Sequence, residues 1–69
     1  MFNWNDLTYF LELARQNRLA PTARRLRVDH TTVSRRIAEL EKGLTVKLFD
    51  RNRDGFVLTE KGHRLLTIA

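Results

Sequence analysis

The chain has 69 residues, 42% hydrophobic and 30% charged, which is the composition of one small folded domain rather than of a disordered segment. A chain this short cannot enclose a deep catalytic pocket, no apolar run approaches the ~20 residues of a membrane-spanning helix, and the first residues lack the basic and hydrophobic regions of a secretory signal. The net charge of +5 favours an anionic partner, and the absence of cysteine excludes disulfides and thiolate metal sites, which is consistent with the cytoplasm.

The first predicted helix begins near Asn3 or Asn5, which are both good N-caps, and ends near residues 16–18. Its apolar positions recur at spacings of three and four residues, as on one face of a helix. These positions are Trp4, Leu7, Leu11 and Ala14, with Phe10 beside them.

A second, short helix is predicted over residues 20–26, because Pro21 is tolerated only in a first helical turn. Asp29 is a predicted N-cap for a third helix, and Gly43 is its predicted terminator. The third helix has an apolar stripe with spacings of four, three and four residues, formed by Val33, Ile37, Leu40 and Leu44.

Two short segments, residues 46–49 and 56–58, are predicted to pair as an antiparallel hairpin around turn-forming residues 50–55. Thr59 then caps a final helix with apolar Leu65, Leu66 and Ile68. The order of elements predicts a mainly α, winged helix-turn-helix fold, with residues 1–58 as the domain and residues 59–69 as the start of a further helix.

The predicted third helix carries groups suited to the DNA major groove. A helix that enters this groove needs a slim, polar outer face near its N-terminus, which Thr31, Thr32 and Ser34 provide, while Arg35 can pair with guanine or phosphate. Arg51 and Arg53 in the hairpin are placed to meet the backbone or the minor groove.

The basic residues are concentrated around this helix. The stretch from residue 15 to residue 36 carries a net +6, with one acid and seven arginines, namely Arg15, Arg18, Arg24, Arg25, Arg27, Arg35 and Arg36. Such a stretch attracts phosphate backbones or anionic lipid, although a solvated basic face on a helical protein is an alternative for the charge alone.

The sequence also resembles the N-terminal domain of LysR-type transcriptional regulators from Trp4 to Leu66. The motifs that carry the resemblance are the Leu-x-x-Phe-x-x-x-Ala of the first helix, the Ala-x-x-Leu before the turn, the Val-Ser-x-x-Ile-x-x-Leu-Glu of the recognition helix, and the Leu-Phe-x-Arg and Leu-Thr-x-x-Gly of the wing. In this chain they are Leu7, Phe10 and Ala14; Ala23–Leu26; Val33–Glu41; Leu48–Arg51; and Leu58–Gly62.

The chain departs from the family pattern at four places. Residues 17–19 replace Gly-Ser-Phe, Pro21 replaces alanine, and residues 29–31 replace Ser-Gln-Pro or Ser-Gln-Ser, so no target sequence can be carried over. Thr45 stands where the family often has glycine.

The resemblance implies sequence-specific binding of double-stranded DNA, with a recognition helix over about Thr31–Lys42 in the major groove. It implies a homodimer formed through the last helix, a linker helix that is cut short here, on an interrupted palindromic operator. It also implies a bacterial cytoplasmic regulator with an effector-binding domain absent from this chain, higher oligomers, RNA polymerase as a further partner, and no membrane association, cofactor or metal. The predicted DNA-binding residues are Arg24, His30, Thr31, Thr32, Ser34, Arg35, Arg36, Arg51 and Arg53.

Three other functions are weighed against this one. Catalysis is disfavoured because His30 and His63 are far apart in sequence and there is no phosphate loop, nucleophile motif or ligand cluster. A winged helix that binds protein has no need of the arginines, and a membrane-surface helix conflicts with apolar stripes that the core requires. His30 can be a capping residue instead of a DNA contact, and Glu39 and Glu41 are expected to face solvent or to pair with nearby cations.

Overall fold

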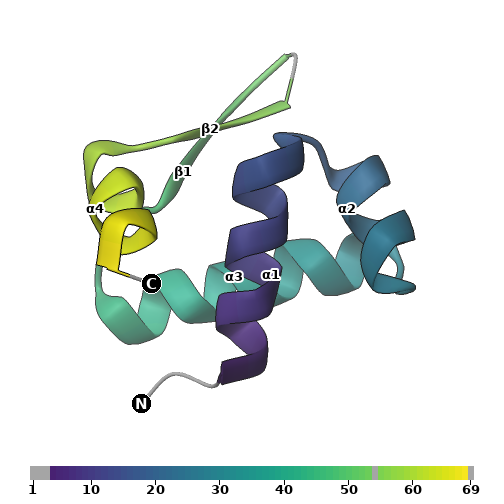
Figure 1. The fold of residues 1–69 in the computed structure, drawn as a ribbon, viewed down its shortest axis with the longest axis horizontal. Coiled ribbons are helices and arrows are strands. Elements are labelled where there is room, and N and C mark those ends of the chain that lie inside the picture. Colours follow the sequence, from purple (N-terminus) through teal and green to yellow (C-terminus); the bar gives the residue numbers. More distant parts are fainter. Residues whose placement is uncertain (1–3, 54, 69) are drawn as a thin grey trace.

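The structure is a computed structural model that describes residues 4–53 and 55–68. It confirms the mainly α, winged helix-turn-helix fold (Figure 1). Helix α1 crosses in front of α3, α2 lies beside them at one end, and the β-hairpin and α4 lie on the opposite side. The elements in chain order are α1 Trp4–Gln16, α2 Leu19–Leu26, α3 His30–Leu44, β1 Phe49–Asn52, β2 Gly55–Leu58 and α4 Glu60–Ile68.

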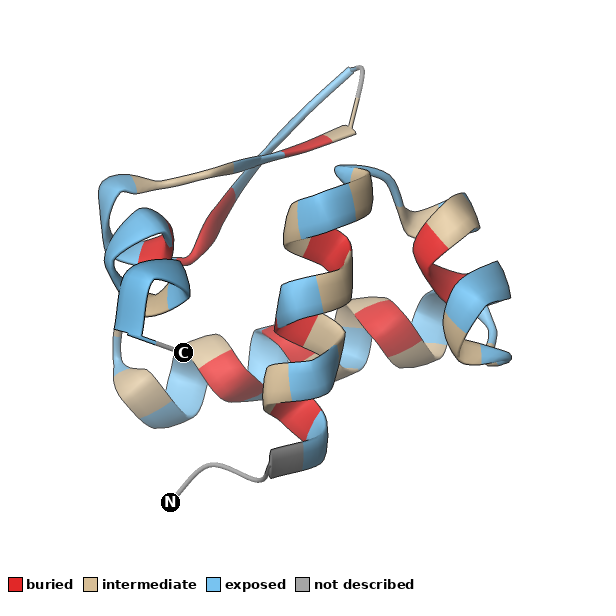
Figure 2. Ribbon diagram, viewed as in Figure 1, coloured by how far each residue is buried: buried red, intermediate tan, exposed pale blue. Residues whose placement is uncertain are grey.

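The core lies where the three helices α1, α2 and α3 meet the hairpin (Figure 2). On α1 the fully buried residues are Phe10 and Leu13, whereas Leu11 is 38% exposed. The predicted stripe is confirmed at Phe10, Leu7 and Ala14, which are buried or packed against the core, but it was wrong at Leu11 and omitted Leu13. The side chain of Trp4 and the predicted cap Asn3 lie outside what the structure describes, and Asn5 lies within the first turn.

Three phenylalanines connect α1 to the hairpin. The ring centroids of Phe10 and Phe49 are 5.6 Å apart, and those of Phe49 and Phe56 are 6.0 Å apart in an edge-to-face arrangement. Both separations fall in the range favoured by aromatic pairs. The hairpin is therefore part of the core and not an appendage to it.

The helix-turn-helix begins with α2, which starts at Leu19, one residue before the predicted start. Pro21 still lies in the first turn, where a missing backbone N–H costs nothing. The Thr22 side chain is fully buried and its hydroxyl donates to the carbonyl of Arg18 over 2.7 Å. The helix ends at Leu26 and is capped by Arg27, which has a left-handed backbone conformation, and the N–H of Val28 donates to the carbonyl of Ala23.

Helix α3 has the predicted start but not the predicted end. The Asp29 carboxylate accepts a 2.7 Å hydrogen bond from the backbone N–H of Thr32, which confirms the N-cap. Gly43 lies within the helix, so its prediction as terminator was wrong. The helix ends at Thr45, whose φ is 58°, because the N–H groups of Thr45 and Val46 fold back onto the carbonyls of Lys42 and Glu41.

The antiparallel hairpin and its second strand agree with the prediction, but the first strand begins later along the chain than predicted. Strand β1 pairs antiparallel with β2, with Phe49 opposite Leu58 and Arg51 opposite Phe56. The predicted first strand, residues 46–49, overlaps β1 only at its last residue, because the apolar segment leads into the core and the pairing residues of the exposed hairpin are mostly polar. Asp54, in the predicted turn, lies outside the described residues.

Helix α4 begins after Thr59, its predicted cap. The N–H of Gly62 donates to the hydroxyl of Thr59 over 3.0 Å. Gly62 is buried against the backbone carbonyl of Leu48, at a distance that leaves no room for a Cβ atom. Within residues 4–53 and 55–68, no helix is long and apolar enough to cross a membrane.

Candidate nucleic-acid interface

The outer face of α3 carries the predicted base-reading residues. Val33, Ile37 and Leu40 are buried, which turns the intervening positions toward solvent. At the start of this helix the exposed side chains are small and polar, and they are followed by a cation. His30, Thr31 and Arg35 are exposed, and Thr32 and Ser34 are half-buried.

The helix start also carries a fixed negative charge. Hydrogen bonds with the side chain and backbone of Thr32 lower the pKa of Asp29 below its ordinary value of 3.8, with smaller contributions from Arg35 and His30. Asp29 is therefore ionised at neutral pH, and it occupies the backbone N–H of Thr32. His30 follows the cap and does not supply it.

Six of the seven arginines in the basic segment are exposed. Among the described residues only Arg36 of this segment forms an ion pair, so Arg24 and the other five have no carboxylate partner there. Solvated guanidinium groups without internal partners are available to phosphate.

Arg36 differs from the rest of the predicted set. Its Nη1 lies 3.5 Å from the Asp6 carboxylate of α1, and its guanidinium lies 5.8 Å from the centre of the Tyr9 ring. Asp6 is only 7% exposed. Arg36 therefore joins α3 to α1, and the geometry gives it a structural role.

The wing brings Arg51 back to the helix that carries Ser34. The Arg51 Nη2 atom donates to the Ser34 hydroxyl over 2.6 Å, and its guanidinium lies 5.0 Å from the centre of the Phe56 ring. Arg53, near the tip, is exposed and makes no such contact with α3.

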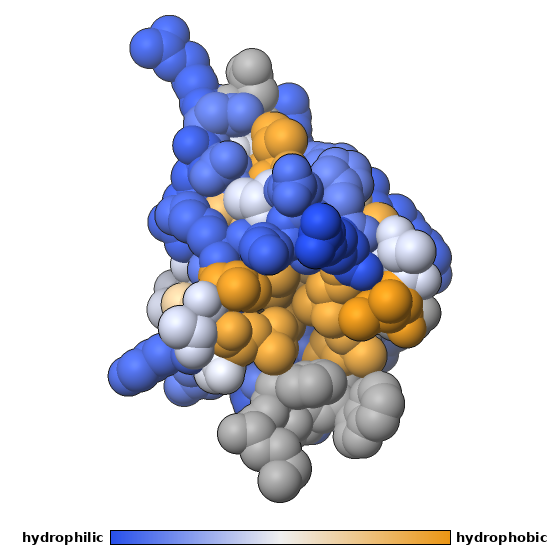
Figure 3. All heavy atoms as spheres, turned by 90° about the vertical axis from the view of Figure 1, so that its left-hand side faces the viewer, coloured by the Kyte–Doolittle hydropathy of each residue, from blue (hydrophilic) through white to orange (hydrophobic). Residues whose placement is uncertain are grey.

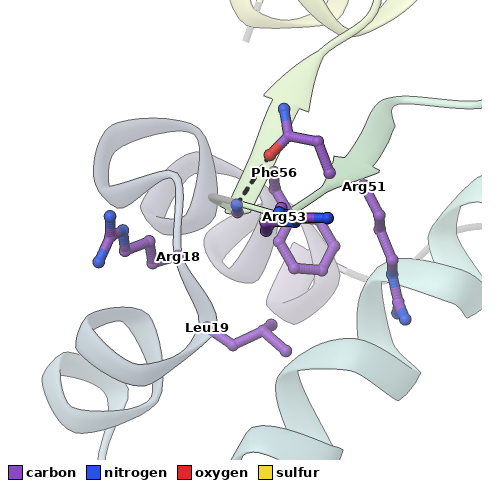
Figure 4. Close-up of a pocket in the computed structure, with 7 residues that line it drawn as sticks. Arg18, Leu19, Arg51, Arg53 and Phe56 are labelled. Atoms are coloured by element: carbon purple, nitrogen blue, oxygen red, sulfur yellow. Dashed lines mark hydrogen bonds between the residues drawn. The ribbon is translucent and has the colours of Figure 1, made fainter.

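A shallow groove of about 400 Å³ separates the wing from the start of α2 (Figure 4). Arg51 points down from the wing toward α3 and Arg18 extends away on the opposite side, so their charges lie at two edges of the groove rather than converge in it. The lining residues are Arg18, Leu19, Arg51, Asn52, Arg53, Gly55 and Phe56.

Sequence reasoning missed the residues that fix the wing in place. Asn17 exchanges two hydrogen bonds with the Phe56 backbone, one of 2.8 Å to its N–H and one of 3.0 Å to its carbonyl. Gly55 has a φ of 144° and lies against the Asn17 carbonyl, where a side chain has no room. The one available signal was Asn17 itself, since asparagine after a helix commonly adopts a left-handed conformation, here with φ 63°.

The described residues include no group of three or more histidines, cysteines or acids arranged to hold a metal ion. The outer face of α3 and the wing instead present hydroxyl groups and arginines.

The match to a known family covers most of the chain. The family described as bacterial regulatory helix-turn-helix protein, lysR family, matches residues 4–63. The HTH-type transcriptional regulator YybE of Bacillus subtilis is 40% identical over 63 residues, and TcbR of Pseudomonas sp. strain P51 is 35% identical over 66 residues. These matches cover 91% and 96% of this chain, which spans 22% of the length of either regulator.

Solved structures show the same fold. The CbnR DNA-binding domain in complex with DNA aligns with a TM-score of 0.93 at 33% identity, over 97% of this chain and 77% of that one. A LysR-family regulator from Eggerthella lenta aligns with a TM-score of 0.86 at 28% identity, over 99% of this chain and 96% of that one. The chain belongs to the lysR family of bacterial regulatory helix-turn-helix proteins.

Proposed function

We propose that this chain binds double-stranded DNA in a sequence-specific manner, as the DNA-binding part of a transcriptional regulator in the bacterial cytoplasm. One observation carries the proposal: the exposed face of α3 begins with small polar side chains and is flanked by arginines that have no carboxylate partner among the described residues. A helix with such a face fits the major groove, and free guanidinium groups fit the phosphates beside it. The complex of the related CbnR domain with DNA supports the proposal.

The proposed contacts fall into two groups. His30, Thr31, Thr32, Ser34 and Arg35 face the base edges, where hydrogen bonds distinguish base pairs. Arg24, Arg51 and Arg53 face phosphates along the backbone and the adjoining minor groove. Arg36, which pairs with Asp6, is left out of both groups.

Selection from a pool of randomised duplexes tests the proposal. We expect the chain to enrich a defined sequence, and Thr31→Ala to relax the preference at one or two base pairs, since a base contact is worth roughly 1–3 kcal/mol of discrimination. Arg53→Ala is the matched comparison, with a similar loss of affinity for every sequence. A pool that stays random after selection would contradict sequence-specific binding.

We also propose that the protein forms a homodimer on an interrupted palindromic operator, with α4 at the interface. Figure 3 shows apolar surface on the side of the molecule that carries α4, beneath a hydrophilic band. On α4 itself Leu66 is 39% exposed and Ile68 is 81% exposed. A two-fold dimer would place its recognition helices about 34 Å apart, one turn of the duplex.

Sedimentation with and without the selected duplex tests the dimer. We expect two chains on each palindromic duplex for the parent and a single chain for the variant L66S/I68S, whose substitutions lie outside the buried core. Unchanged two-to-one binding by the variant would place the interface elsewhere. In a full-length regulator that contains this domain, we also propose higher oligomers and contact with RNA polymerase.

A further inference from the structure

Two contacts fix the guanidinium group of Arg51. Arg51 lies directly opposite Phe56 in the hairpin, and its guanidinium lies over that buried ring at 5.0 Å. The same group reaches α3, where Nη2 lies 2.6 Å from the Ser34 Oγ atom. Asn17 forms two hydrogen bonds with the backbone of Phe56, so the wing backbone below Arg51 is also held in place. Arg51 is thus held against the recognition helix before any DNA is bound.

This contact occupies one of the two lone pairs of the Ser34 hydroxyl. A guanidinium group has only donors, so the Ser34 oxygen must be the acceptor of the 2.6 Å bond. The hydroxyl proton then remains for another partner, and within the described part of the chain Ser34 makes no second side-chain hydrogen bond. A nearby cation also strengthens the hydroxyl as a donor.

We propose that Arg51 is a positioning residue that biases Ser34 toward donating its hydroxyl hydrogen bond to DNA. The inference rests on the proposed function and adds a specificity rule to it. With one of its two lone pairs occupied by Arg51, Ser34 favours an acceptor, such as a phosphate oxygen, a purine N7 or O6, or the O4 of thymine, over the amino groups of adenine and cytosine. Thr31 has no such partner among the described residues, and its hydroxyl is free to donate or to accept.

A double-mutant cycle on the selected duplex tests the coupling. We expect Ser34→Ala to weaken binding on the order of ten-fold in the parent but less than about two-fold in the Arg51→Ala background, because Arg51 biases the hydroxyl toward donation. Ser34→Thr, which keeps a hydroxyl, should restore most of the affinity. Arg53→Ala is the matched control: it removes the same charge from the same wing, and Ser34→Ala should keep its full ten-fold effect in that background.

Modified duplexes identify the acceptor. Substitution of 7-deazapurines removes purine N7, and methylphosphonates remove charged phosphate oxygens; at one such position Ser34→Ala should cost nothing further. All variants are compared by thermal unfolding, so that a loss of folding is recognised as such.

The outcomes separate the two proposals. Failure of the parent chain to select any sequence would overturn both of them. Specific binding by the parent, with an equal cost of Ser34→Ala in the parent and Arg51→Ala backgrounds, would overturn the coupling alone. The coupling would also fall if Ser34→Ala cost nothing in the parent.

Discussion

The carboxylate of Glu41, near the end of α3, accepts a 2.7 Å hydrogen bond from the backbone N–H of Leu48. A second bond of 3.1 Å reaches the same oxygen from the next N–H, that of Phe49. These two bonds fix the start of the wing relative to the helix proposed to read DNA. The expectation that Glu41 faces solvent or pairs with a cation was therefore wrong.

Replacement of Glu41 by alanine should destabilise the fold by about 1–3 kcal/mol, because two backbone donors lose their acceptor. Urea unfolding measures this difference. Glu39→Ala is the matched control, since Glu39 lies exposed on the same helix and its loss should change stability by less than about 0.5 kcal/mol. Equal effects of the two substitutions would contradict the role assigned to Glu41.

Thr45→Gly should stabilise the protein by about 0.5–1 kcal/mol, because a β-branched residue is strained at a φ of 58°. Gly43→Ala, two residues earlier, should also stabilise it by about 0.5–1 kcal/mol, since Gly43 is helical and an added methyl group meets no atom within 4 Å. Thermal unfolding of the two variants checks both expectations. A lower melting temperature for Thr45→Gly would show that the threonine is not strained.

The hydrogen-bonded cap at Asp29 should make the free energy of unfolding depend on pH in the acid range. The hydrogen bonds with Thr32 lower the pKa of Asp29 in the folded state, so its contribution is fully present above the unfolded value near 3.8 and is lost as the pH falls through the folded pKa. Asp29→Asn keeps a capping oxygen but cannot titrate. The parent should therefore lose stability relative to Asp29→Asn as the pH falls below about 3.8, toward the acid limit of folding. Parallel curves of stability against pH for the two proteins would contradict this prediction.

Adjacent arginines on α3 should separate folding from binding. Arg36→Ala leaves the nearly buried Asp6 carboxylate without its cation and should cost about 1–2 kcal/mol of stability. Arg35→Ala, at an exposed position, should leave stability unchanged within about 0.5 kcal/mol while weakening binding to the selected duplex. Unfolding and DNA titrations of both variants decide the assignment; it is wrong if Arg36→Ala leaves the fold unaffected and alone abolishes binding.

The sequence predicted those parts of the fold that local chemistry controls. Asp29 and Thr59 cap the helices as expected, and Val33, Ile37 and Leu40 are buried, because caps and helical periodicity depend on residues close in the chain.

Tertiary contacts account for the errors. The face of α1 that is buried depends on where α3 crosses it, so periodicity alone did not distinguish Leu13 from Leu11. The placement of β1 depends on Glu41, which lies on a different element. The contact of Arg36 with Asp6, thirty positions earlier, likewise does not follow from the local sequence. For the site, composition indicated the face of α3 that is proposed to read DNA, whereas the contact between Arg51 and Ser34 required the folded wing.

Titration of the selected duplex and of a scrambled duplex over a range of salt concentrations tests sequence-specific DNA binding most directly. If Arg24, Arg51 and Arg53 each neutralise one phosphate, the logarithm of affinity should fall with the logarithm of salt concentration at a slope of about −2.7 or steeper. The selected duplex should bind more tightly than the scrambled one at every salt concentration. A flat salt response, or equal affinity for the two duplexes and for an unrelated polyanion such as heparin, would contradict it.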